Sequence, residues 1–216
     1  MAPTVLKIDF VSDISCPWCA IGLHALEQAA ARLQGEVALD WHFQPFELNP
    51  HMGPEGQDIN EHLQEKYGAT PEQSQQTRAA IAERGAALGF AFQMDKRSRI
   101  YNTFDAHRLL HWAAEQGLQR PLKHALFKAY FTDGQNPGSH AVLLRAAQEV
   151  GLDADAARAV LSSDRYAAEV REREAFYQGH GIHSVPAVIV NDRHLIQGGQ
   201  PVEVFEQALR QIATEK

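Results

Sequence analysis

The order of hydrophobic periods along the chain is the feature that most restricts its fold. Segments 5–11 and 37–43 have the β-branched, aromatic and alternating residues of strands. Between them, apolar residues recur at spacings of three and four over 17–33, which predicts a helix. β-rich sequence returns only at 186–196, before a last amphipathic helix over 201–212. Both ends of the chain are therefore expected to contribute strands.

The middle of the chain predicts a long insertion. After a loop over 44–52, residues 58–180 show only helical periodicity, although 90–94 could be a short extended run. The clearest helices are expected over 102–115, 141–150 and 165–177. We interpret the chain as one α/β domain formed by 1–52 and 181–216, with 53–180 as an all-helical insertion.

Composition excludes several classes of function. The chain has 216 residues, of which 44% are apolar and 22% charged, and these fractions are typical of a packed globular protein. The formal charge is −7 with no basic run, which argues against a nucleic-acid surface. No apolar stretch approaches the roughly 20 residues that span a bilayer, so no membrane partner is expected. The first residues lack the pattern of a secretory signal, and we expect a cytoplasmic protein.

The chain has only two cysteines, Cys16 and Cys19, and they form one C-x-x-C. Pro17 suits the first position of the predicted helix, so Cys16 is expected at the N-cap and Cys19 one turn inward. A helix N-terminus stabilises a thiolate, and the N-cap sulfur could accept hydrogen bonds from the N–H of Trp18 or Cys19. We therefore predict an accessible nucleophile at Cys16 and a shielded resolving thiol at Cys19.

Metal binding is the competing interpretation of this pair. Two cysteines cannot complete a four-ligand zinc site, and the conceivable partners are His180, His183 and the pair His107 and His111. Nothing in the spacing places these histidines near the cysteines. We therefore predict no metal site.

Four segments resemble one protein family. A strand that leads into Cys16-Pro17-Trp18-Cys19 at a helix start resembles the thioredoxin superfamily, and the large insertion resembles its DsbA branch. More narrowly, 12–22, 44–50, 102–109 and 181–187 are together similar to the FrnE-like DsbA-family oxidoreductases. The resemblance implies an α/β thioredoxin-like fold with a large all-helical insertion.

The same resemblance implies a thiol–disulfide oxidoreductase that acts on protein or small-molecule disulfides. It implies no cofactor other than the redox-active disulfide, with glutathione left open as a co-substrate and a homodimer left open as an assembly. It also implies Pro186 as a cis-proline facing the sulfurs. The remaining expected substrate-binding residues are Pro17, Trp18 and Val185. Trp18 lies beside the nucleophile, where it could contact substrate or only cap the helix, and a cis bond at Pro186 would leave the Val185 backbone free to pair with an extended substrate chain.

Two alternatives remain open at this stage. Glutathione-dependent isomerases and transferases related to 2-hydroxychromene-2-carboxylate isomerase share the insertion, but they look to carry serine at the first cysteine. A non-enzymatic binding module or chaperone would instead use the groove beside Pro186. The chain also departs from periplasmic DsbA, since Pro-Trp rather than Pro-His separates its cysteines.

Further candidates carry weaker expectations. Asp13 could tune or relay the proton of Cys19, or be a turn residue. Asp9 could be a buried carboxylate near the cysteines or face solvent, and His42 is expected to be structural. We also expect the insertion to cap one side of the cysteine pair, with side chains of 102–112 influencing the choice of substrate.

Overall fold

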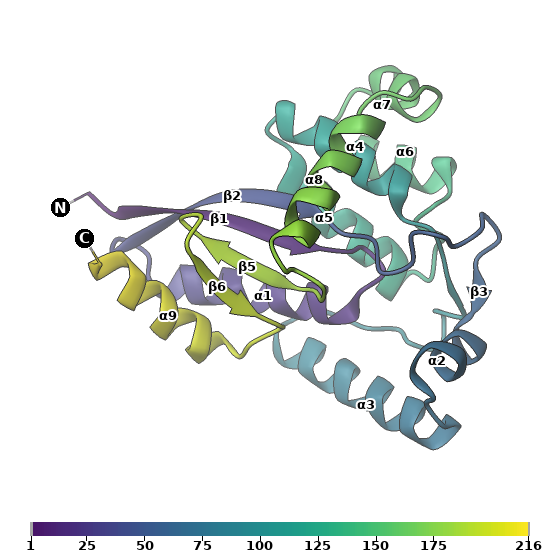
Figure 1. Cartoon of the computed structure of the whole chain (residues 1–216), viewed down its shortest axis with the longest axis horizontal. Coiled ribbons are helices and arrows are strands. Elements are labelled where there is room, and N and C mark those ends of the chain that lie inside the picture. Colours follow the sequence, from purple (N-terminus) through teal and green to yellow (C-terminus); the bar gives the residue numbers. More distant parts are fainter. Residues whose placement is uncertain (1, 216) are drawn as a thin grey trace.

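A four-stranded mixed sheet lies at the centre of the computed structural model, which describes residues 2–215 (Figure 1). Its strand order is β2-β1-β5-β6. β1 pairs in parallel with β2 and antiparallel with β5, and β5 pairs antiparallel with β6. The strands are β1 (Thr4–Ser12), β2 (Val37–Pro45), β5 (Ala187–Val190) and β6 (His194–Gln197). The two ends of the chain thus form one sheet, which confirms the predicted α/β, thioredoxin-like fold.

The two faces of this sheet are covered by different helices. Helices α1 (Pro17–Arg32) and α9 (Val202–Thr214) pack side by side on one face, and α8 (Ala167–Gly179) lies on the other (Figure 1). Neighbouring residues of β1 follow this division, because Phe10 belongs to the main core with α1, whereas Val11 packs with Tyr177 of α8. β1 is buried over most of its length, and its polar residues Lys7 and Asp9 alternate with apolar ones, which places them on the same face as Val11.

The insertion between β2 and β5 is mostly helical and shares its core with the sheet. One cluster of buried apolar residues contains Phe10 of β1, Leu26 of α1 and Phe127 from the insertion. The helices of the insertion before α8 are α2 (Ile59–Tyr67), α3 (Pro71–Ala87), α4 (Phe104–Glu115), α5 (Gln119–Phe127), the π-helix η1 (Lys128–Thr132), α6 (His140–Glu149) and α7 (Ala154–Leu161).

The insertion also holds a small ribbon that helical periodicity did not predict. β3 (Gln57–Asp58) pairs antiparallel with β4 (Arg99–Ile100). Two-residue strands are too short to show an alternating pattern, so the sequence carries no signal for them. The segment 90–94 is neither helix nor strand, and its Phe90 and Phe92 are buried in the core.

Local sequence signals set the ends of α2 and α3, which lie next to the cysteines of α1. The Asp58 side chain accepts hydrogen bonds from two backbone N–H groups at the start of α2, and Gly68 ends that helix at a φ of 65°. Thr70 and Gln73 form a capping box at the start of α3. In the described part of the chain, no helix has the length and apolar character needed to cross a membrane.

Candidate functional site

The two cysteines occupy the first turn of α1, as predicted. Cys16 is the N-cap with extended backbone angles, Pro17 opens the helix, and the Cys19 N–H donates to the Cys16 carbonyl at 3.1 Å. Both are free thiols. Cys19 is fully buried, and Cys16 is only 4% exposed. The nucleophile that was predicted to be accessible is thus mostly buried, and it is reached through the half-open cavity that it lines.

The hydrogen bond of the Cys16 sulfur also differs from the prediction. No backbone N–H of α1 donates to this sulfur. Its partner is the carbonyl oxygen of Val185, at 3.7 Å, to which the thiol donates. A neutral thiol is a weak acceptor, whereas the helix N–H groups would bind the thiolate more strongly. The contact joins the start of α1 to the loop that precedes β5.

That loop lies against α1 because glycines leave room for it. The Val185–Pro186 peptide bond is cis. A Cβ atom at Gly22 would come within 3.0 Å of the Pro186 ring, and one at Gly199 within 2.9 Å of the Trp18 carbonyl oxygen. A larger residue at Gly22 would push Pro186 away from α1, and one at Gly199 would push the segment after β6 away from it, so Gly22 allows Pro186 to approach the cysteine turn.

A cavity of about 660 Å³ lies in front of Cys16. Cys16, Trp18 and Val185 form the wall from the thioredoxin-like part of the chain. The insertion contributes the opposite wall through α2, α3 and the segment 94–100. The helix α4 contributes no residue to this wall, so an influence of side chains of 102–112 on the choice of substrate would not act by direct contact in this cavity. Instead, α4 contacts the site through Asp13, which precedes the cysteines in the sequence.

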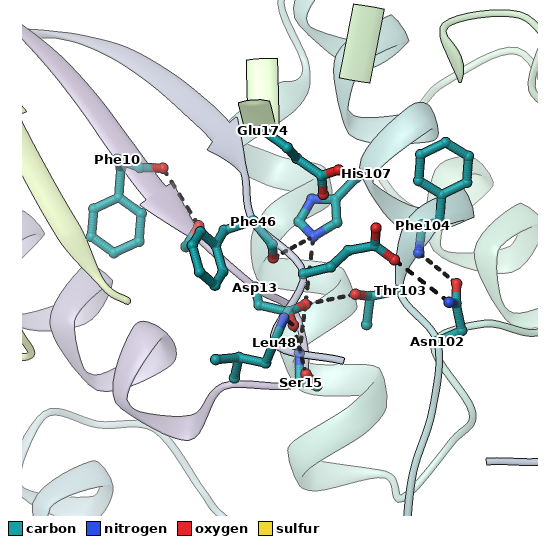
Figure 2. A network of polar contacts seen from close by, with 12 residues as sticks. Phe10, Asp13, Ser15, Phe46, Leu48, Asn102, Thr103, Phe104, His107 and Glu174 are labelled. Carbon is teal, nitrogen blue, oxygen red and sulfur yellow. Dashed lines mark hydrogen bonds and ion pairs between the residues drawn. The ribbon is translucent and has the colours of Figure 1, made fainter. Parts of the chain in front are cut away.

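The Asp13 carboxylate is buried and surrounded by hydrogen-bond donors, some of which belong to the start of α4 (Figure 2). It accepts hydrogen bonds from the Thr103 hydroxyl at 2.7 Å, the Leu48 N–H at 2.8 Å and the Ser15 hydroxyl at 2.8 Å. The imidazole Nε2 of His107 lies 3.4 Å away. Asp13 thus links three segments that are distant in the sequence, and it is more than a turn residue.

These contacts determine the ionisation of Asp13. Burial alone would raise its pKa, but the hydrogen bond and charge of His107, with the Leu48 and Thr103 donors, lower the pKa to about 2. The carboxylate therefore remains charged at neutral pH. A group with so low a pKa is a poor acceptor for the proton of a thiol, which argues against the relay role that the sequence left open.

Different neighbours of Cys19 shift the pKa of its thiol in opposite directions. Burial raises the pKa of its thiol well above the ordinary value, and the hydrogen bond and charge of Cys16 raise it further. The positive charge of Lys123 lowers it. Lys123 lies on α5, is itself fully buried, and burial lowers its pKa to about 8. A cation is thus held behind the resolving thiol.

Other residues singled out from the sequence lie elsewhere. Asp9 is buried and accepts a hydrogen bond from Gln44 at 2.6 Å, and His42 is paired with Asp40 at 2.9 Å. Both contacts are within or beside the sheet, and neither residue lines the cavity.

The four histidines considered as metal ligands are dispersed. His107 contacts Asp13, His111 packs against the Tyr166 ring, and His180 contacts a carbonyl of its own helix. His183 lines the cavity near Cys16. Residues 2–215 contain no group of three or more potential ligands placed to hold a metal ion.

Three buried charged residues at this site were not predicted. They are Lys123, Arg97 and Glu47. Burial raises the pKa of Glu47 to about 7, with a further rise from Glu174, against the opposing effect of Arg171. Glu47 belongs to a segment that carried the family resemblance, which was a usable signal. Lys123 and Arg97 lie in stretches without any motif, and only their burial in the folded chain distinguishes them.

We expect Asp13→Asn to lower the free energy of unfolding at pH 7 by about 2–3 kcal/mol, because the amide cannot accept from all three donors. The lowered pKa of Asp13 means that the charged form stabilises the fold above about pH 4. This contribution is lost as the pH falls from about 4 towards 2. Chemical unfolding curves between pH 2 and 7 should show the loss in wild type and a weaker one in the variant.

Asp164→Asn is the control for this experiment, because Asp164 is exposed on the loop before α8. It should change stability by less than about 0.5 kcal/mol. Equal stability of the Asp13→Asn variant and wild type at pH 7 would contradict the structural role of Asp13.

Comparisons with known proteins agree with this geometry. The chain is similar to a probable DsbA oxidoreductase from Streptomyces coelicolor, with 34% identity, a TM-score of 0.90, and coverage of 98% of this chain and 91% of that one. It is 28% identical to the uncharacterized protein YwbO of Bacillus subtilis, over 94% of this chain and 96% of that protein. The cytosolic disulfide reductase DsbM from Pseudomonas aeruginosa, solved with GSH, shares the fold at 19% identity and a TM-score of 0.62, over 95% and 96% of the two chains.

The family assignment follows from the length of the match. The model of the DSBA-like thioredoxin domain matches residues 7–210, which include the cysteine turn, the whole insertion and the strands at both ends. Since this match spans almost the whole chain, the protein belongs to the DSBA-like thioredoxin domain family.

Proposed function

We propose that this protein exchanges disulfides through Cys16 and Cys19, with Cys16 as the nucleophile and Cys19 as the resolving thiol. The observation that carries the proposal is the difference between the two sulfurs. Cys16 faces the cavity and contacts the Val185 carbonyl, whereas Cys19 is buried one turn behind it. Membership of a family of thiol–disulfide oxidoreductases supports the same chemistry.

The exchange has two balanced steps. The Cys16 thiolate attacks one sulfur of a substrate disulfide, forms a Cys16–substrate disulfide, and releases the other half as a thiolate. The Cys19 thiolate then attacks the Cys16 sulfur, forms the Cys16–Cys19 disulfide, and releases the second thiolate. Both released thiolates take up protons, so the substrate gains two electrons and two protons that the cysteine pair loses. The reverse sequence oxidises a substrate dithiol.

The electrostatics of the pair favour this order. Before the first step, the hydrogen bond and charge of Cys16 keep the pKa of Cys19 high, so Cys19 stays protonated. When Cys16 becomes part of a mixed disulfide, it no longer carries a charge. The opposition to ionising Cys19 then decreases, and the Lys123 cation continues to favour its thiolate.

Three neighbours are proposed to bind substrate. Pro17 and Trp18 line the cavity beside the nucleophile, and the Arg84 guanidinium covers the Trp18 ring at 5.3 Å. The Val185 carbonyl already contacts the Cys16 sulfur, so a substrate that replaces this contact would lie next to the reacting bond. Pro186 is proposed to support that loop beside the cysteine turn.

Finer assignments are part of the same proposal. The segments 12–22, 44–50, 102–109 and 181–187 support a place in the FrnE-like subfamily. Glutathione is proposed as a co-substrate, which is consistent with the GSH in the DsbM structure. We also propose a cytoplasmic location. The presence of cysteine rather than serine at position 16 favours exchange chemistry over the isomerase alternative.

The roles of the two cysteines can be tested by trapping. After challenge with a small disulfide, Cys19→Ser should accumulate a mixed disulfide on Cys16, because nothing resolves it. Cys16→Ser should react at least about tenfold more slowly, because the remaining thiol is buried and its pKa is raised. Intact-protein mass spectrometry measures both adducts, with the double serine variant as the blank. An adduct on Cys19 with none on Cys16 would reverse the assignment.

The role of Lys123 can be tested separately. Lys123→Met should slow resolution of the Cys16 mixed disulfide about tenfold at pH 7 and move its pH profile about one unit towards alkaline pH, because the Cys19 thiolate loses a nearby cation. Stopped-flow release of the second substrate thiol measures this step. Lys128→Met is the matched control, since Lys128 is exposed and paired with Asp133. An unshifted profile in Lys123→Met would refute the electrostatic role.

A further inference from the structure

The cavity in front of Cys16 is positively charged, although the whole chain carries a net charge of −7. Three basic side chains line it, Lys66, Arg78 and Arg97. Among the described residues, the one carboxylate in its wall belongs to Glu47, and that carboxylate is paired with Arg171 of α8. The side chains that line the cavity therefore carry an excess of positive charge, and the nearby Asp13 carboxylate, which acts on Lys66, lies outside its wall.

The hydrogen-bond partners of these three cations are neutral. Lys66 donates to the Leu48 carbonyl at 2.7 Å, and Arg78 donates to the Asn60 side chain at 2.6 Å. Arg97 donates to a backbone carbonyl. Within residues 2–215, no carboxylate oxygen lies within 4.0 Å of a charged nitrogen of any of the three. Each cation remains available to an anion that enters the cavity.

Arg97 is the most constrained of the three. Its side chain is more than nine-tenths buried, with 8% exposure, and its guanidinium lies over the rings of Tyr130 and Phe131 at 5.0 and 5.2 Å. One terminal nitrogen donates to the Ser15 carbonyl at 3.2 Å, but Nε is buried with no hydrogen-bond partner. Burying a charge without a counter-ion is costly, and the contacts with the two rings offset only part of that cost.

Arg97 lies close to the reacting cysteine. Its hydrogen bond goes to Ser15, the residue immediately before Cys16, and both Arg97 and Cys16 line the same cavity. A guanidinium can bind a carboxylate through its two terminal nitrogens, and in Arg97 these are the candidate donors, because the buried Nε does not reach the cavity. A carboxylate bound there would hold the rest of a small ligand beside Cys16.

We propose that this cavity binds low-molecular-weight disulfides that carry a carboxylate, with Arg97 as the anion-binding residue and with Lys66 and Arg78 adding positive charge. The inference rests on the proposed disulfide exchange and specifies its substrate class. A volume of about 660 Å³ lies within the range of small-molecule sites. The insertion and the cysteine turn both contribute walls, so a small ligand in the cavity would contact residues from both.

A pair of matched disulfides tests the proposal. The first is 3,3′-dithiodipropionate, which has a carboxylate at each end, and the second is the neutral bis(2-hydroxyethyl) disulfide. The second-order rate constant for oxidation of the reduced protein is measured for each and divided by the rate constant of reduced dithiothreitol with the same disulfide, which corrects for intrinsic reactivity. Wild type should prefer the dianion at least about tenfold, and Arg97→Gln should reduce this preference about ten- to hundredfold, as expected for a lost charge-assisted hydrogen bond.

Arg158→Gln is the matched control, because it removes the same charge from an exposed position on α7. It should retain the wild-type preference. If Arg97→Gln slows both disulfides equally and raises the pKa of Cys16, Arg97 is a counter-ion of the thiolate, and the proposal is overturned. Faster exchange of a neutral peptide disulfide than of either small disulfide would also overturn it, in favour of protein substrates.

A second measurement needs only the wild-type protein, so it decides the matter if Arg97→Gln does not fold. Suberate has the shape of the dianionic disulfide but no sulfur, and it should inhibit competitively, with weaker inhibition at high salt. The neutral 1,8-octanediol should inhibit at least about tenfold less. Equal inhibition by the two compounds would refute a carboxylate site.

The two proposals fail in different ways. Wild-type protein that reduces neither disulfide would refute the exchange activity itself. Wild-type protein that reduces both equally well would leave the exchange intact and refute only the anion-binding role of Arg97.

Discussion

The geometry of the site depends on the hydrogen bonds that the buried Asp13 carboxylate accepts. It accepts hydrogen bonds from Ser15 beside the cysteines, from Leu48 after β2, and from Thr103 at the start of α4. A buried charge is stable only when several donors surround it, and these donors come from three separate segments. The position of the cysteine turn relative to the insertion is thereby specified by one ionised group. The low pKa of Asp13 is the electrostatic consequence of the same contacts.

The site also contains two buried cations, which lie on different sides of the cysteine pair. Behind Cys19, Lys123 is buried in the core and affects the ionisation of the thiol without reaching the substrate cavity. In front of Cys16, Arg97 lines that cavity and donates to a neutral carbonyl rather than to a carboxylate. The first cation can influence the rate of resolution, and the second can influence which molecule enters. Both come from the insertion, so the insertion does more than cover the thioredoxin-like sheet.

The sequence predicted the position of the two cysteines correctly, but it did not predict which residues surround them. The strand–Cys-Pro-Trp-Cys–helix order placed Cys16 at the N-cap and Cys19 one turn inward, because Pro17 and local capping preferences act over a few residues. The low exposed fraction of Cys16 was not predicted, because the opposite wall of its cavity comes from α2, α3 and 94–100. The helix expected over 102–112 exists, but it contacts Asp13 rather than the cavity. Contacts between distant segments leave no periodic signal.

The sequence by itself determined the fold class, the order of the elements and the position of the cysteine pair. These features follow from hydrophobic periods, from proline and glycine at element ends, and from a motif of four adjacent residues. Only the tertiary structure decided that Arg97 and Lys123 are buried, that Asp13 joins three segments, and that Cys16 faces a cavity. The physical reason is that burial and ionisation depend on what packs around a group, and those neighbours lie tens of residues away along the chain.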